Sequence, residues 1–357
     1  MGGIPEKEDK FHTMNQEEAH TMLRATMPWI IPSDQEDALL AGWPEEIELV
    51  RTFGLSREQT MELMPSIDVF AGVPSYEMLC NAPRLKLVNV VGHGLDFIVH
   101  DARMRDYALE HNIIFCKAQA ADIAIAEYVI ASMINLARRT FKFHQALSID
   151  GRQLHDLRDL VRQEAYTELW ESTVGILGFG PIGKGIAERA YAMGMKVGVV
   201  CRHPESIERE RYGVSFSATL DQLDDFLPSC DFVVIALPRT ADTVDCLNRE
   251  RIGRMKDRSY LVNIARGELV DDDALYEALK SGKIAGAALD VWRNRTRTDG
   301  HYPFPYPIHH FNVIMTPHFV GGTGGARRRV IRFIVENTRR FARGEPLLHV
   351  ADLRAGY

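Results

Sequence analysis

Residues 173–202 read TVGILGFGPIGKGIAERAYAMGMKVGVVCR, and this stretch decides the fold. The apolar run at 174–177 predicts a buried strand, and the glycine-rich motif after it opens a helical pattern. In GxGxxG the first glycine allows a tight turn, the second lets the backbone approach a pyrophosphate, and the third permits close contact between helix and strand. We therefore predict a dinucleotide site at Gly178, Gly180, Pro181, Ile182 and Gly183.

Short apolar runs alternate with longer amphipathic ones along most of the chain, a pattern typical of α/β proteins. After the motif, DFVVIALP, YLVNIARG, IAGAALDVW and FNVIMTPH predict the remaining strands of a doubly wound parallel Rossmann sheet. Before it, WIIP near Trp29, IELV at 47–50, IDVFAGV from Ile67 and LKLVNVVG from Leu85 predict a second, smaller, flavodoxin-like α/β domain.

Two long helices suggest how these domains are connected. ADIAIAEYVIASMINLARR at 121–139 is apolar on most faces, which favours a buried helix running between the domains. ARRRVIRFIVENTRRFARG at 326–344 has one apolar face and is expected to fold back on the first unit. We predict an N-terminal extension at 1–27, a discontinuous substrate domain at 28–137 plus 319–357, and an inserted dinucleotide-binding domain at 138–318.

Composition excludes several functional classes. The 357 residues are 46% hydrophobic and 25% charged, as in soluble globular proteins, and the net charge of −7 without a long basic run argues against nucleic acid. The five cysteines are widely spaced without a CxxC pair, so neither disulfides nor a metal site are predicted. No apolar run reaches the length of a membrane span, and a cytoplasmic protein is expected.

The end of the second Rossmann strand indicates which dinucleotide is preferred. NAD-preferring sites place an acid there to bind the ribose hydroxyls, whereas this chain has Cys201, Arg202 and His203, with no acid before Glu205. A neutral Cys201 does not repel a 2′-phosphate, and Arg202 can pair with one. NADP(H) is predicted over NAD(H); the alternative is that Arg202 stacks on the adenine or faces solvent.

Three further segments, NIARG at 263–267, ALDVW at 288–292 and MTPH at 315–318, complete a recognisable set. Together with GFGPIG they resemble the D-isomer-specific 2-hydroxyacid dehydrogenases, in particular glyoxylate/hydroxypyruvate reductase-like members, from about residue 65 to 350. The resemblance implies a two-domain enzyme, usually a homodimer, with substrate and nicotinamide in the cleft. It implies hydride transfer between NAD(P)H and the carbonyl carbon of a small 2-oxo acid.

The resemblance also assigns site residues. Arg266 would bind the substrate carboxylate and polarise its keto oxygen, and His318 would be the proton donor or acceptor. These residue types suit an α-keto acid, which needs planar cationic donors and a group that titrates near neutrality. Backbone amides near Val91, Gly92, His93 and Gly94 would complete the carboxylate site. Further cofactor contacts are implied for Cys201, Arg202, His203, Leu237, Pro238, Thr243, Ile264, Ala265, Asp290 and Gly321.

One loop departs from the family pattern. Most members have an acid five positions after the ALD aspartate, and it pairs with the catalytic histidine; here that position is Arg295, in a loop longer than is usual in the family. Asn294 or Asp299 are candidate replacements. Arg293, Arg295 and Arg297 either extend a positive field that favours a substrate with a second anionic group, or form a solvated face.

The lost acid leaves two alternative functions open. Formate dehydrogenases of the same superfamily use no such acid, but the asparagine with which they hold formate is Ala121 here. Corepressors of the C-terminal binding protein type use the fold as a dinucleotide-sensing scaffold without catalysis. Neither the particular 2-oxo acid nor the physiological direction follows from the sequence.

Overall fold

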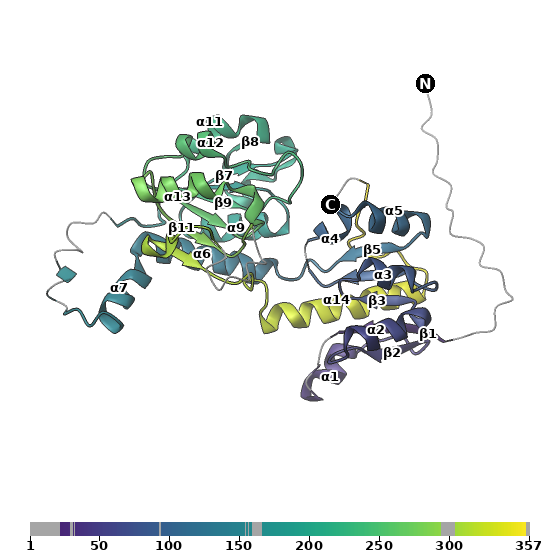
Figure 1. The fold of residues 1–357 in the computed structure, drawn as a ribbon. Coiled ribbons are helices and arrows are strands. Elements are labelled where there is room, and N and C mark those ends of the chain that lie inside the picture. The colour runs from purple at the N-terminus through teal and green to yellow at the C-terminus, as the bar shows by residue number, and fades with distance from the viewer. Residues whose placement is uncertain are drawn as a thin grey trace, which may run out of the picture.

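The computed structural model describes residues 22–28, 31, 33–92, 94–153, 155, 157–158, 166–293 and 304–354. Figure 1 shows two lobes, each built around one twisted sheet covered by helices. Both sheets are entirely parallel, which confirms the predicted α/β class. In the described part of the chain, no helix combines the length and apolarity needed to cross a membrane.

The first sheet has the strand order β2-β1-β3-β4-β5, which is the flavodoxin-like order 2-1-3-4-5. Its strands are β1 (Leu23–Met27), β2 (Ile47–Arg51), β3 (Val69–Ala71), β4 (Leu87–Val90) and β5 (Ile114–Lys117). The helices between and after them are α1 (Ser33–Leu40), α2 (Arg57–Leu63), α3 (Tyr76–Cys80), α4 (Asp96–Val99) and α5 (Ala102–Glu110).

The strand predicted near Trp29 falls mostly outside the described residues; the first described strand is β1, which ends at Met27. It lies between β2 and β3, so the sheet begins within the segment expected to be an extension. The sequence of β1 does not form an apolar run because it contains two polar residues, Arg24 and Thr26. Thr26 is buried and accepts a hydrogen bond from the Ala71 amide at 2.8 Å, and Arg24 forms an ion pair with Glu48. Trp29 itself lies outside the described residues.

The second sheet has the order β12-β11-β10-β9-β6-β7-β8. Counted from β6, this is the doubly wound order 3-2-1-4-5-6 with one added strand, and its switch point lies between β6 and β9. The sequence did not predict β8, nor β5 in the first sheet. The strands are β6 (Thr173–Leu177), β7 (Lys196–Val200), β8 (Val214–Ala218), β9 (Phe232–Ile235), β10 (Ser259–Asn263), β11 (Ile284–Leu289) and β12 (Val313–Met315). The helices are α9 (Pro181–Ala192), α10 (Arg209–Tyr212), α11 (Leu223–Phe226), α12 (Arg249–Arg254) and α13 (Asp272–Ser281).

Helix α6 (Asp122–Arg138) carries the chain from the first lobe to the second. It packs against α9 so closely that a Cβ on Gly185 would lie 3.4 Å from the Cβ of Ala126. At Arg139 the backbone takes a left-handed φ of 51°, and α7 (Thr140–Ser148) leaves in a new direction. Figure 1 shows α7 projecting away from the second sheet.

Helix α14 (Gly324–Ala342) returns to the first lobe, as its apolar face predicts. Val330, Ile331 and Ile334 are buried in one cluster with Met27 and Ala71. Further along, the buried Asn337 donates to Asn89 Oδ1 at 3.1 Å and accepts from the Leu348 amide at 2.9 Å. The last described helix is therefore part of the first lobe's core.

Candidate active site

The glycine motif joins β6 to α9 and has room for a pyrophosphate. Gly178 has φ 105°, and a Cβ there would lie 2.5 Å from the Ala236 carbonyl oxygen. A Cβ on Gly183 would lie 2.1 Å from the Gly178 carbonyl oxygen, which explains the close helix–strand contact. Gly180 precedes the first turn of α9, and a Cβ there would meet nothing within 4 Å. The open helix N-terminus after Gly180 fits a dinucleotide phosphate.

A cavity of about 210 Å³ lies at the end of β7, beside the glycine motif. Its basic lining residues are Lys184 from α9 together with Arg202 and His203. Burial raises the pKa of the Cys201 thiol, so that lining residue stays neutral near pH 7. Lys184 was not predicted from the sequence; its position one residue after the third glycine was the available signal.

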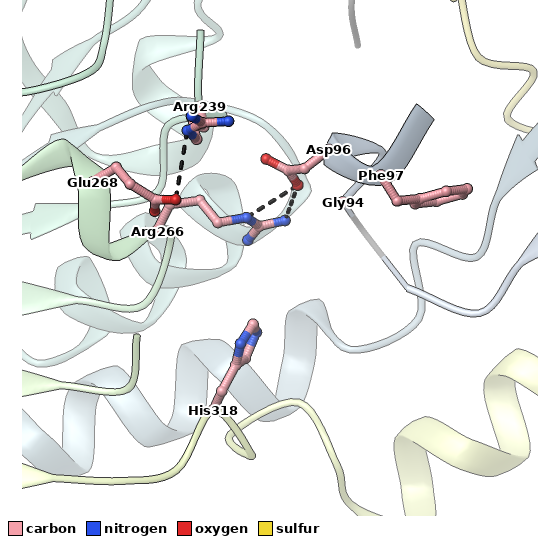
Figure 2. A pocket seen from close by; sticks show the side chains of 7 residues that line it. All are labelled: Gly94, Asp96, Phe97, Arg239, Arg266, Glu268 and His318. Atoms are coloured by element: carbon pink, nitrogen blue, oxygen red, sulfur yellow. Dashed lines mark hydrogen bonds and ion pairs between the residues drawn. The ribbon is translucent and has the colours of Figure 1, made fainter. Parts of the chain in front are cut away.

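The main cleft is a cavity of about 390 Å³ between the lobes. It brings Arg266 and His318 to one site, as the motifs imply. Figure 2 shows His318 on one side and the Arg266 guanidinium opposite, beside Asp96. The site residues on the second lobe follow β9, β10 and β12, at the carboxyl edge where parallel sheets bind ligands. The lining residues are Gly94, Asp96 and Phe97 from the first lobe and Arg239, Arg266, Glu268 and His318 from the second.

Arg266 is held by its neighbours and by one carboxylate from the other lobe. Its backbone oxygen accepts from Asn263 Nδ2 at 2.9 Å, and its Nη1 donates to the Ala265 carbonyl oxygen at 2.7 Å. Its Nε and Nη2 donate to Asp96 Oδ2 at 3.1 and 2.5 Å. A Cβ on Gly94 would lie 1.9 Å from Nη2, so a side chain there would displace the guanidinium from this position.

The Asp96 carboxylate is ionised in this arrangement. Burial opposes its ionisation, but the hydrogen bonds and charge of Arg266 outweigh that effect and lower the pKa of Asp96. The Nε and Nη2 donors of Arg266 therefore bind a carboxylate of the protein itself, the same chemical group that they would bind on a substrate.

His318 lies on the loop after β12 with a left-handed φ of 56°. The loop is fixed by Asp290, whose side chain is fully buried and accepts from Thr316 Oγ1 at 2.7 Å, the Phe319 amide at 3.1 Å and the Val320 amide at 3.4 Å. Thr316 Oγ1 also lies 3.0 Å from the Tyr128 hydroxyl on α6. Asp290, for which a cofactor contact was expected, thus positions the loop that carries His318.

Several other residues assigned from the resemblance have structural partners. Val91 packs against the cluster that includes α14, while Gly94 lines the cleft; His93 lies outside the described residues. Gly92 lies in the loop after β4, and a Cβ there would meet nothing within 4 Å. A Cβ on Gly321 would lie 3.1 Å from the Cβ of Ala121, where the chain returns to the first lobe.

The loop after β9 is held by hydrogen bonds between its own residues. Thr243 is buried, accepts from the Thr240 amide at 2.7 Å and donates to the Pro238 carbonyl oxygen at 2.8 Å. Leu237, Ile264 and Ala265 pack into the two core clusters of the second lobe.

Arg293, the first arginine after ALDVW, is not among the described residues that line the cleft. Arg293 donates to Asp245 and, at 2.7 Å, to the Val270 carbonyl oxygen. Asn294, Arg295, Arg297 and Asp299 lie outside the described residues. Arg293 therefore stabilises a loop junction through these partners.

Asp96, Phe97, Arg239 and Glu268 line the cleft but were not predicted from the sequence. Arg239 follows the strand β9, just as Arg266 follows the neighbouring β10. The same rule about the carboxyl ends of parallel strands therefore singles out both arginines.

The fold and the glycine motif define a dinucleotide-binding protein with a second, cleft-forming domain. Residues 130–320 match the model of the family described as D-isomer specific 2-hydroxyacid dehydrogenase, NAD binding domain. A glyoxylate reductase of Pyrococcus furiosus is 31% identical over 320 residues, covering 87% of this chain and 88% of that protein. The chain therefore belongs to the D-isomer-specific 2-hydroxyacid dehydrogenase family, which confirms the resemblance drawn from its motifs.

Two further relatives add detail. A D-3-phosphoglycerate dehydrogenase of Bacillus subtilis is 32% identical over 313 residues, covering 87% of this chain and 55% of that protein. A solved D-isomer specific 2-hydroxyacid dehydrogenase from Xanthobacter autotrophicus Py2, in complex with NADPH and MES, is 28% identical with a TM-score of 0.73. The match covers 94% of this chain and 99% of that one. A nicotinamide dinucleotide is thus the cofactor class.

Replacing the buried Asp290 tests its role in fixing the His318 loop. Asp290→Asn puts an amide donor where two backbone amides and a hydroxyl donate, and we expect a loss of about 2–4 kcal/mol in the free energy of unfolding. Urea unfolding measures it. The matched control Asp257→Asn, at a largely exposed residue paired with Lys283, should change stability by less than about 0.5 kcal/mol. Equal effects in both variants would contradict the assignment.

Proposed function

We propose that this protein transfers hydride between a nicotinamide dinucleotide and the carbonyl carbon of a small 2-oxo acid, as a 2-ketoacid reductase or D-2-hydroxyacid dehydrogenase. One observation carries the proposal. A planar cation, Arg266, and a histidine, His318, line the same cavity at the carboxyl edge of the sheet that holds the glycine motif. Binding a carboxylate and moving a proton at an adjacent oxygen require these two groups together.

The chain's own groups divide the work as follows. Arg266 binds the substrate carboxylate through its donor fork, and the loop at Gly94 lets that fork approach without a side chain in the way. A bound reduced nicotinamide supplies the hydride. His318 donates a proton to the carbonyl oxygen as negative charge develops there, and takes it back in oxidation. Asp290 keeps the histidine in place through the loop amides.

Loss of NADPH absorbance at 340 nm with a panel of 2-oxo acids tests this activity, with glyoxylate, hydroxypyruvate and pyruvate as the first substrates. His318→Asn should lower kcat by about a hundredfold to ten-thousandfold with NADPH binding retained, since only the proton transfer is lost. His111→Asn, at an exposed position after α5, is the matched control and should keep full activity.

Other results of the panel point to other functions. Bound NADPH with no turnover of any acid would favour a dinucleotide-sensing scaffold. Reduction of the oxidised cofactor by formate alone would favour a formate dehydrogenase-like enzyme. Full activity in His318→Asn would remove the histidine from the mechanism.

We also propose a preference for NADP(H) over NAD(H). The support is the cavity at the end of β7, where Lys184, Arg202 and His203 stand around a neutral Cys201. Arg202→Gln should raise the KM for NADPH about tenfold to a hundredfold and change that for NADH little, because only the 2′-phosphate contact is removed. Lys196→Gln, at the opposite and exposed end of β7, is the control. A wild-type preference for NADH would overturn the proposal.

A homodimer is the proposed assembly. Helix α7 projects from the second lobe and leaves Phe141 and Ile149 exposed at 55% and 74%, with Trp170 at 63% on the same lobe. A projecting helix with such side chains needs a partner surface, and a second copy suits it because the family is usually dimeric. Light scattering should give twice the chain mass, and Ile149→Glu should shift it toward the monomer. Phe53→Glu, on the first lobe, should not; an unchanged dimer in both variants would contradict this interface.

A further inference from the structure

Arg239 is a second arginine in the main cleft that the mechanism above does not use. It follows β9 by four residues, as Arg266 follows the adjacent β10 by three, and the two strands pair in register at Ile235 and Asn263. Figure 2 shows both guanidinium groups on the second-lobe side of the cavity. The site thus offers two planar cations on neighbouring loops.

The two arginines differ in how well their donors are satisfied. Arg266 makes hydrogen bonds to Asp96 and to a backbone oxygen. Among the described residues, the ion-pair partner of Arg239 is Glu268, at 3.6 Å from its Nε, and this buried Nε has no hydrogen-bond acceptor there. Buried polar groups left in this state are costly, and a ligand that supplies the acceptor removes the cost.

We propose that Arg239 determines substrate specificity by binding the second anionic group of a dianionic 2-oxo acid, whose first carboxylate is held by Arg266. The inference rests on the proposed function for the position of that first carboxylate. A carboxylate or a phosphonate satisfies the same requirement, since each offers coplanar oxygen acceptors to a guanidinium. Glu268 opposes this binding, because it pairs with Arg239 and repels an anion.

Binding to the full-length protein in the presence of oxidised NADP⁺ tests the inference without turnover. Calorimetry should give oxaloacetate and phosphonopyruvate lower Kd values than the monoanion 2-oxobutyrate, about tenfold to a hundredfold. The two dianions distinguish a carboxylate from a phosphonate as the preferred second group. Arg239→Gln should abolish this discrimination and leave the Kd of 2-oxobutyrate unchanged, and Arg239→Lys should restore part of it.

Two more variants sharpen the test. Glu268→Gln should strengthen dianion binding, the opposite direction to Arg239→Gln. Arg254→Gln, on α12 and paired with Glu250, is the matched control and should leave every Kd unchanged. With NADPH as the varied ligand, the Kd of the cofactor should be the same in wild type and Arg239→Gln.

The contrary results are equally distinct. Equal Kd values for monoanions and dianions in the wild type, or an equal loss of both in Arg239→Gln, would overturn the inference. A weaker NADPH complex in Arg239→Gln would assign this arginine to the cofactor phosphates and overturn it as well. Dianion discrimination without turnover of any acid would contradict the proposed function and leave the specificity role standing, whereas turnover without discrimination would do the reverse.

Discussion

The site depends on one buried carboxylate. Asp290 has no exposed surface, and a buried charge is tolerated only where donors surround it; here these are two loop amides and the Thr316 hydroxyl. The chain passes between the lobes at α6 and again after His318, and Thr316 touches Tyr128 on α6. The Trp292 indole also donates to the Thr316 carbonyl oxygen, at 3.0 Å. The two segments that connect the lobes are therefore in contact at Thr316, two residues before His318.

Much of the fold could be predicted because its signals are local. The GFGPIG motif lies within a single strand–turn–helix unit, and a buried strand such as β9 reads as a continuous apolar run. The same criterion failed at β1, where Arg24 and Thr26 interrupt the run. Their polarity is compensated by Glu48 and the Ala71 amide, on neighbouring strands that the sequence does not place side by side.

The site was predictable where motifs carry it and unpredictable where distant charges pair. Arg266 and His318 follow strands in recognisable segments. Asp96 meets Arg266 across 170 positions of sequence, and only the docking of one lobe on the other brings them together. The family motif implied a cofactor contact for Asp290, but the sequence could not predict its three hydrogen-bond donors, because they come from a loop whose course the sequence does not reveal.

The Arg266–Asp96 pair also changes what binding at this site means. The cleft carries its own counter-ions, one carboxylate for each of the two arginines among its described lining residues. An anion that binds the Nε and Nη2 donors of Arg266 must displace Asp96 from them. Its binding free energy is therefore the difference between its own interaction with the guanidinium and that of Asp96. Release of the anion would be the reverse exchange, in which Asp96 pairs with Arg266 again. For the proposed substrate, binding and release would therefore each be an exchange of one carboxylate for another on Arg266.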